Sequence, residues 1–510
     1  MKTTLTKLAL IASLSARIEK LDALIIGSGF GGAFAADALV SAGLRVAMVE
    51  RGPWRDTDPV RAAGIAERSP LPHGRHALTH LVRRVSAPWL PKSGVNPHFH
   101  GLFDLHLDRD MTVACSSGVG GGSHVYGAAN TRPSVPDYWD NRADGLDDAS
   151  MDCHYDAAIA RMGARVPGIG ENIPNFTGDR FANDPLFSAD ASLPQPAMGF
   201  RFEQGSYSSN CFLGCADGSK VTLDALLIAP AMQRGLLMLD LHEAIGFGRT
   251  GKGAWWVALR DLRSGSYRHL VAPRLLLAAG TLNTLRLLFA NRALGALGAM
   301  PALGLGFGGN GEAVGWWARN DAQADYSIGA PIHGRFAIRG EEDGPALFSC
   351  GINGVDELPL PRALRARLKR DILLFSIARD EANGFATSVN GRLRLCYDRH
   401  ANPGLAQAES VFAKIASISG KSVYSLPSFP FTIHPIGGAR IDDNPERGVI
   451  NGQGEAHGLP GLFVVDASAF PAAPGSPPSM SIAAWASHVA RGIGGNDSLA
   501  SQSKHTESVA

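Results

Sequence analysis

The chain has 510 residues, of which 45% are hydrophobic and 19% charged, and its formal net charge is +1. This length exceeds what one simple hydrophobic core organises, so we expect two closely packed domains. Because 48 basic residues are scattered among 47 acidic ones, the composition argues against nucleic acid or an anionic membrane surface as a partner and favours a small-molecule ligand.

The N-terminal residues 1–17 place Lys2 and Lys7 before the apolar stretch LALIASLSA. This pattern faintly resembles a secretory signal, but its apolar core is short and the first expected strand follows closely. We therefore expect a cytoplasmic protein, with export as the alternative. No apolar run reaches the roughly eighteen residues that cross a bilayer, so the chain is not expected to be integral to a membrane.

Residues 21–52 predict a βαβ unit that binds an adenine dinucleotide. An apolar strand is expected over 21–26, a helix of small residues ends at Gly43, and a second strand is expected over 44–49. Such a unit holds the pyrophosphate of the ligand on the free N–H groups at the start of its helix.

Three glycines follow the first strand in the spacing that dinucleotide binding requires. They permit a tight turn, close approach to a pyrophosphate, and close packing of the helix on the strand, and they are Gly27, Gly29 and Gly32. Glu50 ends the second strand, where a carboxylate accepts hydrogen bonds from a ribose diol. The same carboxylate disfavours a 2′-phosphate, so NADP is not expected.

A second glycine cluster lies at residues 115–133, CSSGVGGGSHVYGAANTRP. Such a loop lets the backbone approach a flat or charged ligand. Here the chain resembles the glucose-methanol-choline (GMC) oxidoreductase family, and within it the bacterial cholesterol-oxidase-like branch. In that family the loop lies along FAD near the isoalloxazine ring, so the resemblance implies FAD as the cofactor. The matching positions include Gly118, Gly120, Gly121, Gly122 and Ser123.

The resemblance implies a fold of the α/β and α+β classes, in which a discontinuous Rossmann-type FAD-binding domain combines with a sheet-based substrate domain. The FAD-binding domain is expected over residues 18–130, 222–315 and 430–495. The substrate domain is expected over 131–221 and 316–429, and residues 496–510 are expected to form a disordered tail.

Further segments match the family in the middle of the chain. Ala244, in LHEA, is similar to the edge strand that lays its backbone against the adenine ring. Gly280 lies in 271–292, which resembles the family's second signature, a buried strand meeting a helix. Residues 306–313, GFGGNGEA, resemble a loop of the cholesterol-oxidase-like branch.

Two further features are given no chemical role. Cys211 and Cys215 are the only close pair among six cysteines, and we interpret them as reduced thiols of a structured loop, because nearby residues supply no further ligands for a metal. No metal site is expected. His124 is treated as unlinked to the cofactor, since the family usually binds FAD without a covalent bond.

The C-terminal segment carries the expected chemistry. His434 opens the motif HPIGG, and a strand over 462–465 leads to Asp466. In the relatives the histidine lies over the flavin and either accepts the proton of the substrate hydroxyl or orients the alcohol, while the carbinol hydrogen passes to the flavin as hydride. The matching aspartate lies near the ribityl chain and pyrophosphate. An unperturbed imidazole suits this task, because its pKa of about 6.5 lies near operating pH.

One position departs from the family pattern. The asparagine or histidine that partners the catalytic histidine falls on Pro477, which has no hydrogen bond to donate. Ser476 or Ser479 is the candidate replacement donor. Pro478 matches the following family proline and begins a helix over 479–491, whose N-terminus would stabilise the negative charge of reduced flavin.

Two segments are expected to lie on the substrate side of the site. Residues 354–361, GVDELPLP, resemble the part of cholesterol oxidases that carries an active-site glutamate, which makes Glu357, or its neighbour Asp356, a catalytic candidate. Tyr424, Phe429 and Phe431 precede His434, and they either line an apolar pocket or belong to the core.

These features predict FAD-dependent oxidation of a hydrophobic or aromatic alcohol to an aldehyde or ketone. The electron acceptor is oxygen, a quinone or a redox protein. Because Pro477 removes a usual donor, two alternatives stay open: a flavoprotein lyase or isomerase without net oxidation, and a non-catalytic FAD-binding protein.

Overall fold

A computed structural model describes residues 20–168, 171–176, 187–188, 195–204, 207, 211–339, 344–425 and 430–507. The signal-like N-terminus and Phe429 lie outside the described residues. Within the described part of the chain, no helix is both long and apolar enough to cross a bilayer.

A parallel five-stranded sheet organises one half of the molecule. Its order is β23-β13-β1-β2-β9, and every neighbouring pair of strands is parallel. Distant parts of the chain supply its strands, which are β1 (Ala23–Ile26), β2 (Val46–Val49), β9 (Leu237–Leu239), β13 (Arg274–Leu277) and β23 (Leu462–Val464). The predicted βαβ unit is thus the centre of a sheet that other segments complete.

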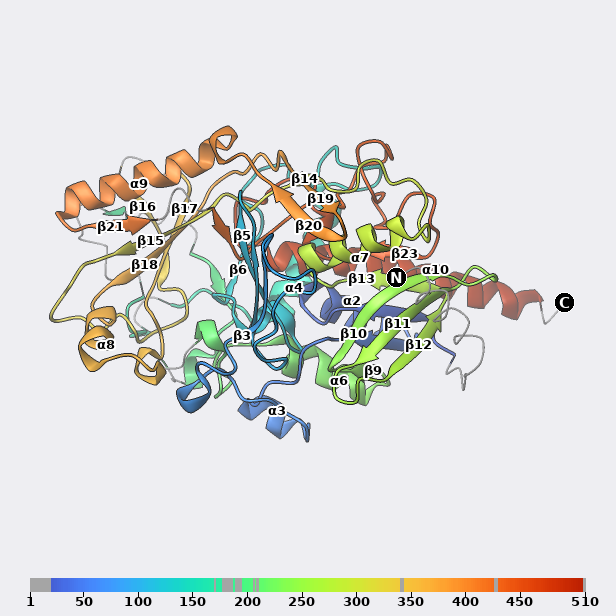
Figure 1. Cartoon of the computed structure of the whole chain (residues 1–510), viewed down its shortest axis with the longest axis horizontal. Coiled ribbons are helices and arrows are strands. Elements are labelled where there is room, and N and C mark those ends of the chain that lie inside the picture. Colours follow the sequence, from blue (N-terminus) through green and yellow to red (C-terminus); the bar gives the residue numbers. More distant parts are fainter. Residues whose placement is uncertain are drawn as a thin grey trace.

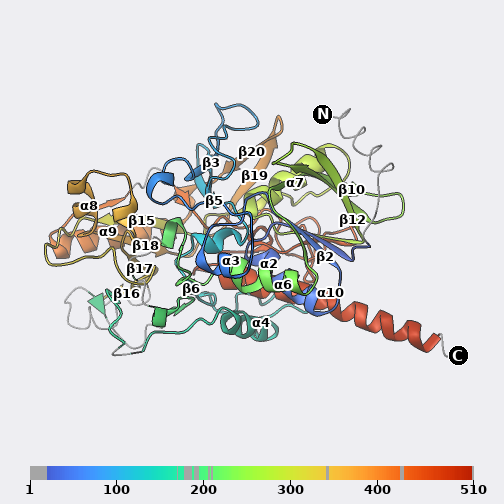
Figure 2. The same ribbon diagram turned by 90° about the horizontal axis from the view of Figure 1, so that it is seen from below.

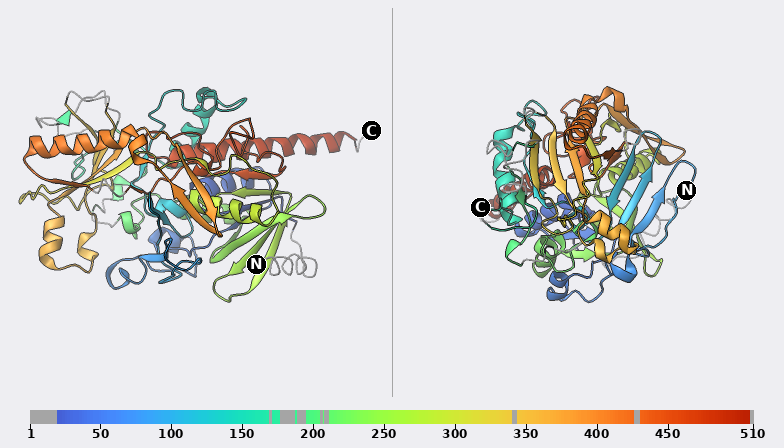
Figure 3. Two further views of the ribbon diagram at one scale, coloured as in Figure 1. Left: turned by 45° about the horizontal axis from the view of Figure 1, so that its top comes forward. Right: turned by 90° about the vertical axis from the view of Figure 1, so that its left-hand side faces the viewer.

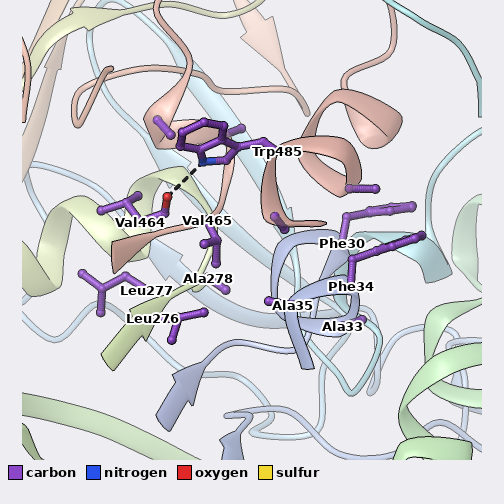
Figure 4. Close-up of a cluster of buried hydrophobic side chains, with 14 of the residues drawn as sticks. Phe30, Ala33, Phe34, Ala35, Leu276, Leu277, Ala278, Val464, Val465 and Trp485 are labelled. Atoms are coloured by element: carbon purple, nitrogen blue, oxygen red, sulfur yellow. Dashed lines mark hydrogen bonds between the residues drawn. The ribbon is translucent and has the colours of Figure 1, made fainter. Parts of the chain in front are cut away.

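Two helices pack together beside this sheet. Helix α2 (Phe30–Ser41) packs against α10 (Ser479–Glu507). Buried alanines on α2 leave room for this close approach. In the core that they share with the sheet, the indole N–H of Trp485 donates to the carbonyl of Val464 at 3.0 Å (Figure 4). The two ends of the chain are therefore joined in one hydrophobic core.

A second, antiparallel sheet organises the other half of the molecule (Figure 1). In the order β21-β15-β18-β17-β16-β7, its strands are β21 (Val423–Ser425), β15 (Glu312–Trp317), β18 (Ile372–Ile377), β17 (Ala346–Cys350), β16 (Gly334–Ile338) and β7 (Phe187–Ser188). Helix α9 (Pro403–Ser419) packs against it, burying Phe412 and Ile415 with Trp317. This pairing of a parallel and an antiparallel sheet confirms the predicted fold class.

A four-stranded sheet connects the two halves, in the order β22-β5-β4-β3. Its strands are β3 (Val82–Ser86), β4 (Phe103–Leu107), β5 (Thr112–Ser116) and β22 (Phe431–Thr432). Strands β5 and β22 are parallel, with Thr432 opposite Val113. Because the chain leaves both strands in the same direction, the glycine loop after β5 and His434 after β22 reach the same edge.

The remaining strands form smaller sheets. The sheet β10-β11-β12 lies at the end of the molecule opposite the six-stranded sheet (Figures 1 and 2). Its strands are β10 (His242–Arg249), β11 (Trp255–Asp261) and β12 (Tyr267–Ala272). A further sheet has the order β14-β19-β20, with β14 (Leu305–Phe307), β19 (Gly384–Val389) and β20 (Arg392–Cys396), and β6 (Ala129–Asn130) pairs with β8 (Ala197–Met198). The other α-helices are α3 (Asp58–Ala62), α4 (Asp148–Arg161), α6 (Ala229–Gln233), α7 (Thr281–Ala293) and α8 (Arg362–Leu368).

The C-terminal helix differs from the prediction. Helix α10 runs from Ser479 to Glu507, whereas the sequence predicted a helix over 479–491 and a disordered tail from residue 496. The tail expectation was wrong for residues 496–507, which extend the helix beyond the body of the molecule (Figure 3). No proline follows Pro478 in the chain, so the backbone hydrogen bonds of the helix are not interrupted.

Candidate active site

A cavity of about 240 Å³ lies where the two glycine clusters meet the C-terminal segment. It is bordered by turns that follow β1, β5 and β13 and by the start of α10. Its polar and backbone wall includes Gly29, Gly121, Gly122, Gly280, Glu312, His434, Asp466, Pro477, Pro478 and Ser479. The fold therefore brings together segments that are hundreds of residues apart.

Some of the glycines are required by backbone packing. A Cβ atom at Gly27 would lie 2.1 Å from the carbonyl oxygen of Ala278, and the φ of Gly27 is +102°. A Cβ at Gly32 would lie 2.0 Å from the oxygen of Gly27. A Cβ at Gly31, a glycine that was not among those predicted from the sequence, would lie 2.0 Å from the carbonyl oxygen of Val465. These glycines let the first turn and α2 approach β13 and β23.

Other glycines face open space. At Gly29 the nearest atom to an added Cβ would be Cα of Gly121 at 4.0 Å, and at Gly122 and Gly280 no protein atom lies within 4 Å. Since these three residues line the cavity, side chains here would occupy the cavity itself. A cradle without side chains fits a large flat ligand such as a flavin dinucleotide.

Glu50 is held rigidly at the end of β2. One carboxylate oxygen accepts from the backbone N–H of Ser28 at 3.2 Å and from its hydroxyl at 2.8 Å, and the other accepts from Gly52 N–H at 2.8 Å. Glu50 and Ala244 line a smaller cavity of about 140 Å³ next to Gly27. Ser28, which the sequence argument passed over, fixes the direction of the carboxylate.

The glycine loop is shaped by left-handed backbone. Gly118, Gly120 and Gly121 have φ values of +145°, +93° and +52°. A Cβ at Gly121 would lie 2.7 Å from Cα of Gly29, so the two glycine clusters touch through their backbones. Ser123 is buried and accepts from Leu223 N–H at 3.1 Å; its hydroxyl stabilises the loop and does not line the cavity.

Asp466 is a buried residue of the cavity wall. One oxygen accepts from Gly280 N–H at 2.9 Å and from the Thr284 hydroxyl at 2.5 Å, and the other accepts from Ser468. Burial raises the pKa of Asp466 above its ordinary value despite these hydrogen bonds. Asp466 thus ties the turn after β13 to the turn after β23.

His434 lies on the cavity wall beside a carboxylate that the sequence argument missed. Nδ1 of His434 is 3.5 Å from Oε2 of Glu312, whose side chain is 1% exposed while that of His434 is 21% exposed. The same Oε2 accepts from Ile433 N–H at 2.9 Å, and Oε1 is buried without a hydrogen-bond partner. Glu312 is the first residue of β15, EAVGWW. An acidic residue at the start of an apolar strand is the sequence feature that could have identified it, because acids are seldom placed in apolar segments.

Glu357 does not reach this cavity. It is not among the lining residues; its side chain is 44% exposed and lies 3.2 Å from Nδ1 of His73. Asp356 accepts from Lys369 on the surface. The structure therefore corrects the assignment of Glu357 as the active-site acid, because the turn that carries it faces His73 and solvent.

The two candidate serines lie differently around Pro477. Ser476 is buried outside the cavity and donates to the carbonyl of Arg132 at 2.9 Å, so it does not fill the place of a donor toward His434. Ser479 lines the cavity, and its hydroxyl is 3.4 Å from the carbonyl of Ala129. Pro477 and Pro478 also line the cavity at the start of α10.

The rest of the cavity wall is mainly apolar. It includes Phe103, Phe212, Ile332, Phe348, Phe375, Ile377 and Ile433. A second cavity, of about 570 Å³, lies on the other side of Glu312, which lines both. Its apolar lining includes Val314, Trp316, Leu373, Leu405, Phe412, Tyr424 and Phe431. Tyr424 and Phe431 thus border a pocket.

The cysteine pair belongs to a loop that supports the cavity. Cys215 accepts from Lys220 N–H at 3.3 Å, and Lys220 Nζ donates to the carbonyls of His124, at 2.6 Å, and Cys211. Burial lowers the pKa of Lys220 to about 8. These bonds connect the loop that carries Phe212 to the glycine loop. Among the described residues, no cluster of acidic, histidine and cysteine side chains is placed to hold a metal ion.

His124 lies behind the glycine loop. Its Nε2 is 2.7 Å from the carbonyl of Val119 and 3.4 Å from Oδ2 of Asp224. The ring is fully buried, and burial lowers its pKa. His124 does not line the cavity.

Comparisons with known proteins agree with this geometry. Residues 21–304 and 421–486, together more than half of the chain, match the sequence profiles of the GMC oxidoreductase family. A cholesterol oxidase of Mycobacterium tuberculosis is 26% identical over 92% of this chain and 90% of its own length. A long-chain-alcohol oxidase of Arabidopsis thaliana is 23% identical over 91% of this chain and 66% of its own length.

Solved structures share the fold. The crystal structure of pyridoxine 4-oxidase from Mesorbium loti has a TM-score of 0.57 at 18% identity and covers 92% of this chain and 99% of its own. A fungal aryl-alcohol oxidase has a TM-score of 0.55 at 14% identity, over 94% of this chain and 99% of its own. The chain therefore belongs to the GMC oxidoreductase family, whose members bind FAD.

Proposed function

We propose that this flavoprotein oxidises a hydrophobic or aromatic alcohol to the corresponding aldehyde or ketone. The observation that carries the proposal is the pairing of His434 with Glu312 at 3.5 Å on the wall of an apolar cavity. A proton acceptor next to a buried carboxylate, in a space lined mainly by apolar side chains, suits the removal of a hydroxyl proton.

The two smaller cavities have the chemistry of the two ends of FAD. Around the 140 Å³ cavity, the fixed carboxylate of Glu50 suits the adenosine ribose, and the backbone of Ala244 suits the adenine. At Gly29, Gly122 and Gly280 no side chain projects from the wall of the 240 Å³ cavity, which leaves this part of the wall for the flavin side. When bound, FAD supplies a two-electron acceptor for the carbinol hydrogen.

The residues around the flavin side have distinct tasks. Because Nδ1 of His434 faces Glu312, Nε2 is the ring nitrogen left for the substrate hydroxyl. Glu312 stabilises the protonated imidazole by its charge. The N-terminus of α10, which begins at Ser479, lies at the cavity and carries the positive end of the helix dipole, which favours negative charge on the flavin side.

The apolar cavity on the other side of Glu312 supports a hydrophobic substrate. Its volume of about 570 Å³ is in the range of small-molecule sites. The relatives named as oxidases of cholesterol, long-chain alcohols and aryl alcohols act on substrates of this character. A free sugar would leave its hydroxyls without partners on such a wall.

Anaerobic reduction tests the proposal. The purified yellow protein is mixed without oxygen with a sterol, an aryl alcohol, a long-chain alcohol or glucose, and flavin absorbance is followed. We expect bleaching by at least one apolar alcohol and none by glucose. A flavin that no alcohol bleaches, in a protein that still converts a substrate without net oxidation, would replace the proposal with a lyase or isomerase.

Substitution of glycines that face open space tests the cofactor site. Gly122→Val is expected to leave the protein folded and to abolish most FAD binding, because its side chain meets no protein atom and fills the cavity. Gly298→Val is the matched control, since Gly298 is exposed and also has no neighbour within 4 Å. Flavin absorbance per protein and circular dichroism provide the measurement. A Gly122→Val protein with full FAD content would contradict the placement.

Substitution at the mouth of the larger apolar cavity tests the substrate class. Tyr424→Ala is expected to raise KM for an apolar alcohol about three- to tenfold with little change in kcat, because part of an aromatic contact of about 0.5–1.5 kcal/mol is lost. Tyr267→Ala is the matched control: the two side chains are 60% and 57% exposed, and Tyr267 lies on β12. Equal KM values in the two variants would exclude this cavity as the substrate site.

A further inference from the structure

Another cavity, of about 730 Å³, lies outside the active site. It lies between β3, β4, α7 and the hairpin formed by β19 and β20, and it shares no lining residue with the cavity of His434. The proposed alcohol oxidation leaves this cavity without a role.

The wall of this cavity is strongly cationic. Its only carboxylate is Asp108, so the formal net charge of the wall is +5, whereas that of the whole chain is +1. The cationic residues are Arg84, Lys92, Arg286, Arg292, Arg392 and Arg394. Asp108 is bound by Arg394, whose guanidinium donates to its two oxygens at 2.8 Å and 3.0 Å. Five cations are thus left without a carboxylate in the wall.

Arg84 and Arg286 are two partly buried cations of this wall. Nε of Arg84 is buried without a hydrogen-bond acceptor. Arg286 donates to two neutral acceptors, Oδ1 of Asn283 at 2.8 Å and Nδ1 of His106 at 3.0 Å. Burial, together with the charge of Arg84, lowers the pKa of Arg286 to about 10. Neither guanidinium forms an ion pair with a described carboxylate.

His106 adds a neutral donor. Because its Nδ1 accepts from Arg286, the ring proton is on Nε2, which is buried without a hydrogen-bond partner. Oδ2 of Asp108 is 3.7 Å from this nitrogen, beyond a normal hydrogen bond. Burial lowers the pKa of His106, which keeps the ring neutral.

We propose that this cavity binds a small molecule that carries two or more phosphoryl charges. Guanidinium groups match phosphate oxygens in both charge and geometry, and the cavity volume fits a ligand of metabolite size. Arg84 and Arg286 also line the cavity of Glu50, so the ligand lies beside the adenosine end of the dinucleotide site. The proposal does not depend on which alcohol is oxidised.

Calorimetric titration of the FAD-loaded protein with inorganic pyrophosphate tests the site. We expect saturable binding of one pyrophosphate per chain, with no release of FAD, and weaker binding as the salt concentration rises. Arg84→Gln and Lys92→Gln are each expected to weaken binding about tenfold or more, the scale of a lost charged contact. Lys92 is exposed at the cavity, so Lys92→Gln is expected to fold even if Arg84→Gln does not.

Lys421→Gln is the matched control, because it removes the same charge from an exposed lysine that does not line the cavity. It should bind pyrophosphate as the unaltered protein does. The proposal is overturned if the FAD-loaded protein shows no saturable binding. Equal weakening in all three variants, binding that requires loss of FAD, or citrate binding as tightly as pyrophosphate would also overturn it.

Discussion

His434→Ala is expected to leave FAD bound and to slow flavin reduction by an alcohol about a hundred- to ten-thousandfold, the usual cost of losing a general base. The substitution removes the proton acceptor on the cavity wall. It leaves the backbone N–H of residue 434, which donates to Thr432 Oγ1 at 2.8 Å, in place. Stopped-flow reduction without oxygen measures the rate, and flavin absorbance measures cofactor content.

His400→Ala is the control for this experiment, because His400 is exposed and lies outside the cavity. It should reduce flavin at the unaltered rate. If His434→Ala also reduced flavin at a near-normal rate, the proton acceptor would have to be another group, and Glu312 would be the first candidate on the cavity wall.

Glu312→Gln is expected to slow flavin reduction about ten- to hundredfold, which corresponds to the 1.5–3 kcal/mol of a charged contact. The amide keeps the size of the side chain and an oxygen that accepts from Ile433 N–H, so the fold is preserved. The loss should appear in the rate of flavin reduction and not in FAD content, which flavin absorbance measures. A purely structural role would instead lower FAD content or the fraction of folded protein.

Glu357→Gln provides the matched comparison, since it makes the same change in the acid that the sequence argument favoured. Glu357 is half-exposed and pairs with His73, so we expect a rate within about twofold of the unaltered protein, as for most surface changes. Slow reduction in Glu357→Gln together with normal reduction in Glu312→Gln would restore the sequence-based assignment.

The dinucleotide-binding unit was predictable because its constraints are local. Gly27 has a left-handed φ and touches the backbone of Ala278, and only glycine satisfies both conditions. The spacing of glycines between two apolar strands, with Glu50 at the end of the second, therefore predicts the backbone conformation of the turn. The HPIGG motif of His434 is likewise contiguous, and the family resemblance placed it correctly in the C-terminal segment of a GMC fold.

Only the tertiary structure decided which acid faces His434. Glu312 lies in a segment that resembles a loop of the cholesterol-oxidase-like branch, and Glu357 lies in one that resembles its glutamate-bearing segment. Their positions differ because β15 begins beside Thr432 and Ile433, while residue 357 turns toward His73. The length of α10 was also misjudged, since composition alone did not reveal that the helix continues to Glu507.

The cationic cavity shows the same limit. Its arginines come from β3, α7 and β20, which are far apart in the sequence, and Lys92 comes from the segment after β3. By itself, the sequence determined the dinucleotide turn, the family and the position of the histidine motif, because contiguous residues encode local backbone geometry. The tertiary structure alone decided the His434–Glu312 pair and the clustered cations, because they depend on which distant segments pack side by side.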